Sequence, residues 1–201
     1  MNLVSKIFTV VFIIISLFLA FQLYSSIKTS IDEEREIQFV EGKIIDQLKM
    51  IREAQGAYQA VNGSYTSDWD KLLNFVDSGS FYIIDRKETI ITLDYGADSI
   101  YVELDTLGTI SVMDSIFTAA KYPNFSLQSL PYVPVGQPEW DGVKFQMWAD
   151  KIDKSGVMVN VMEVWNPKPF DKTRKDDDTR NSRRPLRFGS RTNVSIAGNW
   201  E

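Results

Sequence analysis

A nearly unbroken apolar stretch close to the N-terminus constrains this chain more than any other feature. Residues 7–21 read IFTVVFIIISLFLAF, and only Thr9 and Ser16 interrupt the apolar side chains. Residues 3–24 give about 33 Å of helix, which matches a hydrocarbon core of ~30 Å. The twelve Ile, Leu, Val and Phe residues among residues 7–21 favour insertion by about 4 to 7 kcal/mol. The lipid bilayer is therefore the first expected partner, and the expected anchor residues are Ile7, Phe8, Val11, Phe12, Ile15, Phe18 and Leu19.

A cleaved secretory signal is the alternative interpretation of the same stretch. Such signals have an apolar region of ~7–15 residues followed by a small-x-small cleavage site. At the candidate sites near Ala20 and Ser26, Phe18 and Tyr24 stand where a small residue belongs. A retained anchor is the favoured prediction.

The charges on either side of the stretch predict its orientation. Lys6 and the amino terminus lie on the short N-terminal side, whereas residues 28–36 carry four acidic and two basic side chains. The positive-inside rule then keeps the N-terminus in the cytoplasm and places the C-terminal part in the periplasm or outside the cell. We expect a single-pass protein of the cell membrane.

Charge and two missing residue types exclude several function classes. The net charge of -5 disfavours nucleic acid as a partner, because phosphate backbones require a basic surface. The chain has no Cys and no His, which removes disulfides, thiolate zinc sites and Ser-His-Asp catalysis. Asp68 with Asp70, and Asp176–Asp178, are explained more simply by a helix cap and a solvated loop than by Ca²⁺ binding. We expect no enzyme, no metal and no cofactor.

Residues 25–60 are predicted to continue the anchor as one long helix. No Pro precedes Pro123, and apolar residues recur three or four apart from Ile27 to Ile51. The apolar stripe weakens across residues 32–36, so the half from Val40 to Tyr58 is expected to pack on a domain. A self-associating coiled coil is the alternative use of this stripe.

A small α+β domain is expected next. Asn62-Gly63 signals a turn, and Ser67 is the predicted N-cap of a short helix that buries Leu72, Leu73 and Val76. Alternating apolar residues predict a hairpin between residues 143–149 and 157–164, in which Phe145 and Met147 share a face with Val157, Val159 and Val161. Before it, four short strands are predicted at Phe81–Ile84, Thr89–Leu93, Ile100–Leu104 and Thr109–Val112.

The composition changes again after Trp165. Residues 166–184 mix acidic and basic side chains and are expected to form a solvated loop. The tail beyond them carries Leu186, Phe188 and Trp200, which are expected to dock on this domain or on a protein partner. As a partner contact, the tail would be dispensable for folding, so deletion of residues 183–201 is expected to leave the domain folded.

Three short segments carry a resemblance to a known family. Residues 51–58 (IREAQGAY), residues 62–66 (NGSYT) and the pair Leu72-Leu73 resemble the order Ala-x-x-x-Tyr, Asn-Gly-x-Tyr and Leu of type IV pilins and pseudopilins. The resemblance implies an anchoring helix packed on an antiparallel sheet and a place in an envelope assembly. The prepilin leader is lacking, because no Gly precedes Ile7 and Val11 or Phe12 stands where those proteins have Glu.

The prediction is therefore an α+β protein in which an N-terminal transmembrane helix continues into a long amphipathic helix packed on a small antiparallel sheet. Its expected parts are the cytoplasmic stub and anchor 1–24, helix 25–60, exported domain 61–165, and charged loop and tail 166–201. The favoured function is a structural or accessory subunit of a membrane or surface assembly, with protein partners or further copies of itself. The alternative is a membrane-anchored module that binds cell-wall glycan or peptide through its five Trp residues.

Overall fold

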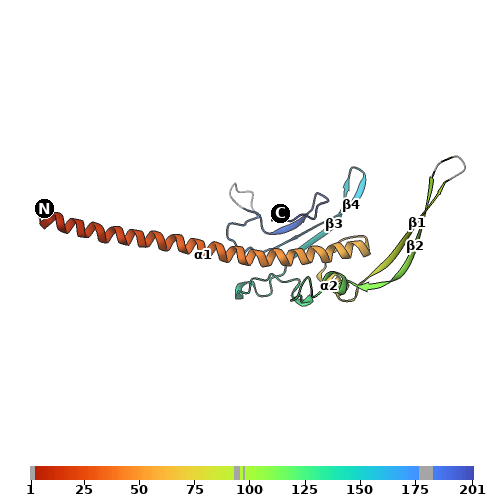
Figure 1. The fold of residues 1–201 in the computed structure, drawn as a ribbon, viewed down its shortest axis with the longest axis horizontal. Helices are drawn as coiled ribbons and strands as arrows, with labels where there is room; N and C mark the ends of the chain where they lie inside the picture. Colours follow the sequence, from red (N-terminus) through yellow and green to blue (C-terminus); the bar gives the residue numbers. More distant parts are fainter. Residues whose placement is uncertain (1–2, 93–95, 97, 177–182) are drawn as a thin grey trace.

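The computed structural model describes residues 3–92, 96, 98–176 and 183–201. One helix, α1 (Leu3–Asn62), runs from the N-terminus through the folded domain, and at 60 residues it is about 90 Å long. Figure 1 shows its N-terminal half standing clear of every other element. The predicted α+β class is confirmed in its coarse form: a long apolar N-terminal helix is followed by small antiparallel sheets.

The end of α1 follows from local chemistry at the predicted Asn-Gly turn. Gly63 has a φ of 75°, a left-handed conformation that glycine adopts without steric cost. Its N–H donates to the Gln59 carbonyl at 2.8 Å, and the Asn62 side chain donates to the Tyr58 carbonyl at 3.0 Å. The first bond satisfies the Gln59 carbonyl, one of the last four of the helix, and the second ties the Asn62 side chain back to the last turn.

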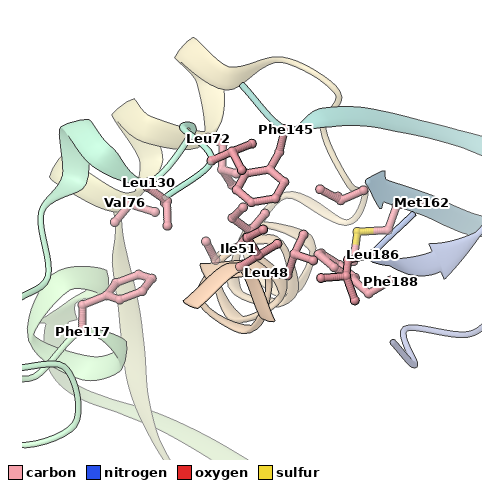
Figure 2. Packing of buried hydrophobic residues seen from close by; sticks show 14 of the residues in the cluster. Leu48, Ile51, Leu72, Val76, Phe117, Leu130, Phe145, Met162, Leu186 and Phe188 are labelled. Atoms are coloured by element: carbon pink, nitrogen blue, oxygen red, sulfur yellow. The ribbon is translucent and has the colours of Figure 1, made fainter. Parts of the chain in front are cut away.

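The C-terminal half of α1 forms the centre of the core. Its buried apolar side chains lie three or four residues apart, as predicted: Val40, Ile44, Leu48, Ile51, Ala54 and Ala57. Figure 2 shows Leu48 and Ile51 between two groups of apolar side chains, with Val76, Leu130 and Phe117 on one side and Met162, Leu186 and Phe188 on the other. The helix is thus enclosed by the domain from two directions, which makes its stripe a packing surface within this chain.

The short helix α2 (Trp69–Ser78) lies against α1 and buries Leu72 and Val76, while Leu73 is half-buried. Its N-cap is Asp68 and not the predicted Ser67: the Asp68 carboxylate accepts the N–H of Asp70 at 2.9 Å and of Lys71 at 3.5 Å. A carboxylate at this position also complements the positive end of the helix dipole.

Strands β1 (Ser80–Thr92) and β2 (Asp98–Ser111) form a two-stranded antiparallel sheet that projects from the domain (Figure 1). The four short predicted strands are therefore two long ones. The charged run Asp85–Glu88, which looked like a turn, lies inside β1 and is paired with residues 102–105 of β2. A short helix, α3 (Val112–Ile116), and the two 3-10 turns η1 (Leu127–Ser129) and η2 (Pro138–Trp140) follow.

The second sheet contains β3 (Gln146–Lys154), β4 (Val157–Trp165) and β5 (Arg187–Ser190) in that order, all antiparallel. Ser155 and Gly156 connect β3 to β4 with φ angles of 57° and 83°, as a two-residue type I′ hairpin turn requires.

The predicted hairpin is present, but its predicted face is wrong. A two-residue turn pairs odd-numbered residues of β3 with even-numbered residues of β4, so Met147 stands opposite Val164. Directly paired residues share a face, and Met147 therefore shares one with Val164, whereas Val159 and Val161 point to the other. Only the end of β4 nearest α1 is buried on both faces, where Val161 and Met162 are each 2% exposed.

Candidate functional site

No other element in the described part of the chain covers the apolar N-terminal half of α1. All seven predicted anchor residues are exposed, and Phe12 keeps 66% of its surface. Among the described residues, this is the one helix long and apolar enough to cross a membrane. A helix that is apolar on every side needs an apolar surrounding. The segment therefore has the length and composition of a transmembrane or signal anchor.

The projecting β1–β2 hairpin is the second exposed apolar surface. Because directly paired residues share a face, Ile84, Ile90, Ile100, Val102 and Leu104 all lie on one side of the distal hairpin. Ile90 and Leu104 are 65% and 63% exposed. We call these five residues the hairpin apolar face. The sequence prediction missed it, although the register of an unbroken hairpin would have brought the five residues together.

The opposite side of the distal hairpin is mostly polar, although the exposed Ile91 also lies on it. It carries Asp85 paired with Asp105, Lys87 with Glu103, and Thr89 with Tyr101. Two ion pairs lie along β1: Arg86 with Glu88 at 2.6 Å on the apolar face, and Lys87 with Asp85 at 3.9 Å on the polar one. Ion pairs this exposed contribute little to stability, so they leave the charged run available to other partners.

The C-terminal tail packs into the fold through part of its length, while Val194 and Ile196 remain 63% and 50% exposed. Leu186 is 2% and Phe188 0% exposed, and β5 is hydrogen-bonded to β4. Trp200 is half-buried against the same core, beside Arg52 of α1. Of the two docking surfaces that the sequence left open, the structure shows docking on this domain: Leu186 and Phe188 belong to its core, and Trp200 packs against it.

The charged loop is also more firmly held than predicted. Asn166, Asp171 and Arg174 are buried, and Arg174 forms a two-pronged ion pair with Glu41 of α1. One of its two bonds, from Nη2 to Oε2, is 2.8 Å long, and Nη1 also donates to the Arg184 carbonyl at 3.0 Å. The first part of the loop is thus fastened to the long helix. The predicted acidic group Asp176–Asp178 lies largely outside the described residues.

The remaining titratable clusters act as ion pairs. Lys121 and Tyr122 both donate to Glu53, at 2.7 Å and 3.1 Å, and the hydrogen bond to Glu53 raises the pKa of Lys121. The buried Glu163 is held by Arg187 at 3.1 Å and by Arg191 at 2.6 Å. Within the described part of the chain, no group of three or more His, Cys, Asp or Glu residues is placed to hold a metal ion.

All five Trp side chains are engaged inside the molecule. Trp69 donates to the Phe145 carbonyl and Trp140 to the Lys168 carbonyl, each at 3.0 Å. The Arg191 guanidinium stacks near both Trp148 and Trp165, at 5.5 and 4.9 Å from their ring centroids. Trp148 and Trp165 thus share one face of the β3–β4 hairpin with Arg191 between them, whereas Trp69 and Trp140 pack at other places in the domain.

Three comparisons with known proteins place this chain in no family. No protein-family description, no curated protein and no solved structure matches it.

Proposed function

We propose that this chain is a non-enzymatic, single-pass envelope protein that serves as a structural or accessory subunit of a membrane or surface assembly. In this proposal, the apolar half of α1 spans the cell membrane with its N-terminus in the cytoplasm. The folded domain, whose plan is pilin-like in combining a long helix with antiparallel sheets, then lies in the periplasm or outside the cell.

The observation that carries the proposal is the presence of two uncovered apolar surfaces at opposite ends of one molecule (Figure 1). Lipid would cover residues 7–24, and a protein partner would cover the hairpin apolar face. Soluble monomers rarely expose apolar surface on this scale, and contiguous patches mark interaction sites. Because α1 both crosses the proposed membrane and forms the centre of the core, the hairpin would be held at a fixed distance from the bilayer.

A membrane-anchored module for cell-wall glycan or peptide remains the second hypothesis, and the contacts of the Trp residues count against its simplest form. Carbohydrate recognition through stacked aromatic rings needs free ring faces gathered in one cleft. Here Arg191 stacks on both Trp148 and Trp165, and Arg52 lies beside Trp200.

Extraction of the tagged full-length chain in a mild detergent tests the proposal. After size separation, mass spectrometry should find the chain in a complex of defined stoichiometry. The matched control is a chain in which residues 84–106 are replaced by a short turn, which should keep its anchor and core but lose the complex. If the intact chain migrates as a monomer of 23.0 kDa, the subunit role is wrong. Retention of that monomer on purified cell-wall material would support the binding module.

A further inference from the structure

The outer edge of the projecting hairpin has a nearly palindromic sequence. Residues 83–91 of β1 read IIDRKETII, so two Ile residues flank a charged centre in either direction. Counting outward from Lys87, Arg86 mirrors Glu88, Asp85 mirrors Thr89, and each Ile mirrors another Ile. A strand with this pattern is complementary to itself when it runs antiparallel.

The edge that carries this pattern has no strand beside it. Among the described residues, β1 pairs with β2 alone, so the peptide groups along its other edge have no strand partner. Proteins commonly place charges on such an edge to prevent association. A protective run of one sign would repel a second copy, whereas the run Asp85–Glu88 contains both signs and sets Arg86 opposite Glu88 when two copies run antiparallel about Lys87.

We propose that two copies of this chain associate by antiparallel pairing of their β1 strands, centred on Lys87. The product is one four-stranded sheet with the order β2, β1, second-copy β1, second-copy β2. Arg86 of each copy then stands opposite Glu88 of the other, Ile84 opposite Ile90, and Ile83 opposite Ile91. This inference rests on the hairpin geometry and not on the proposed function.

In this pairing Lys87 stands opposite Lys87 of the second copy, and nearby carboxylates offset the repulsion between the two positive charges. Within each hairpin, Glu103 stands directly opposite Lys87, and Asp85 lies 3.9 Å from its ammonium group. In the paired sheet, Asp85 of the second copy also comes diagonally beside Lys87, at a distance that long side chains bridge. The two lysines are therefore surrounded by carboxylates on the polar face of the sheet.

The same charges disfavour pairing through the other strand. β2 carries Asp98, Glu103 and Asp105 and no basic residue, so two β2 edges would bring only acidic groups together. Both basic residues of the paired segments, Arg86 and Lys87, lie on β1. Electrostatics thus selects the β1 edge.

Self-pairing also accounts for a projecting hairpin that has few contacts with the rest of the domain to stabilise it. An isolated two-stranded hairpin is marginally stable in water, and three or more strands are needed for independent stability. From residue 84 to residue 91, every side chain of β1 except that of Asp85 is exposed, so the domain gives the distal hairpin little support. Joining two hairpins supplies the missing strands.

Disulfide crosslinking of the full-length chain in detergent tests this pairing directly, because the natural chain contains no Cys. Lys87→Cys places two thiols directly opposite each other, where Cβ atoms lie about 4.5–5.5 Å apart. The matched control is Glu103→Cys, which lies on the same face at the same level but on β2. We expect mild oxidation to give a covalent dimer with Lys87→Cys and little with Glu103→Cys. Equal crosslinking of both variants, or none with Lys87→Cys, would overturn the proposal.

Charge exchange at the mirrored pair provides an independent test of register. In the Lys87→Cys background, Arg86→Glu places Glu opposite Glu twice and should slow crosslinking about tenfold. Adding Glu88→Arg restores opposite charges and should restore the rate. Failure of this rescue would contradict the Lys87-centred register. If the chain shows no self-pairing but still forms a complex with other proteins, this inference is refuted and the proposed function stands.

Discussion

Residues 7–24 and residues 40–57 belong to the same unbroken helix, but the first segment is almost entirely apolar and the second mixes apolar with charged and polar side chains. In the first segment the apolar side chains point in all directions and stay exposed, whereas in the second they form one stripe that the domain buries. Both the number of apolar residues and their distribution around the helix distinguish the two segments. A stripe needs one covering surface, and an evenly apolar helix needs an apolar solvent.

The two segments also depend on different surroundings. The stripe depends on elements from the whole domain, including the C-terminal tail through Leu186 and Phe188. The N-terminal segment contacts none of them. Substitutions in the domain should therefore change folding and leave membrane association intact, and substitutions in residues 7–24 should do the opposite.

The largest effect is expected from deletion of residues 183–201. The deletion removes β5 and two fully buried side chains, each worth about 3 kcal/mol or more, which together approach the 5–15 kcal/mol of a typical domain. We expect the truncated domain to lose its cooperative melting transition and to be digested by protease, while the chain stays in the membrane fraction. A truncated chain that melts like the full-length protein would show that the tail is not part of the core.

The next effect compares two leucines of α1. Leu48→Ala opens a cavity in the core and should lower the free energy of unfolding by about 3 kcal/mol, because Leu48 is 0% exposed. Leu17→Ala, on the same helix, should leave thermal unfolding in detergent unchanged, because Leu17 touches no part of the domain. Equal losses of stability would mean that the N-terminal half packs on the domain after all.

A smaller effect is expected at the ion pair between α1 and the charged loop. Glu41→Gln removes the charge that balances the buried Arg174 and should cost about 2 kcal/mol in denaturant unfolding. Glu33→Gln is the control, since Glu33 is exposed on the uncovered part of the helix. If both substitutions are neutral, the loop is not fastened through this pair.

The smallest effect concerns pH. The hydrogen bond from Arg52, at 2.6 Å, lowers the pKa of the Glu201 carboxyl below its usual value of 4.5. A lowered folded-state pKa means that the contact stabilises the tail above pH ~4.5 and that this contribution is lost as pH falls through the folded-state value. The melting temperatures of the natural chain and of Glu201→Gln should therefore differ slightly at pH 7 and converge in acid. A difference that persists at low pH would assign the effect to packing.

Local patterns in the sequence were enough to predict α1, its buried stripe and the β3–β4 hairpin. Each of these depends on apolar periodicity or on turn residues that lie close together, such as Asn62-Gly63 and Ser155-Gly156. The charged run Asp85–Glu88 misled the prediction, because β strands accept charges where both faces are open to water. The charges that suggested a turn lie in the middle of β1 instead.

Contacts between distant residues escaped the sequence prediction. Glu41 and Arg174 are 133 positions apart, and neither carries a local signal for the other. The mixed charges around Arg174 looked like an ordinary solvated loop, although one of them is buried. For Leu186 and Phe188, the sequence shows apolar side chains but not which surface they cover. Only the fold of β5 onto β4 decides that question.

Two serines of α1 give the most direct test of the claim that one helix lies in two environments. Ser16 and Ser30 are both exposed in the structure, and they differ only in lying inside or beyond the apolar segment. In sealed membranes, a water-soluble maleimide added on the side of the folded domain should label Ser30→Cys and should leave Ser16→Cys unlabelled until the protein is denatured in detergent. Equal labelling of both variants before detergent is added would show that residues 7–24 are in water, and the membrane anchor would be wrong.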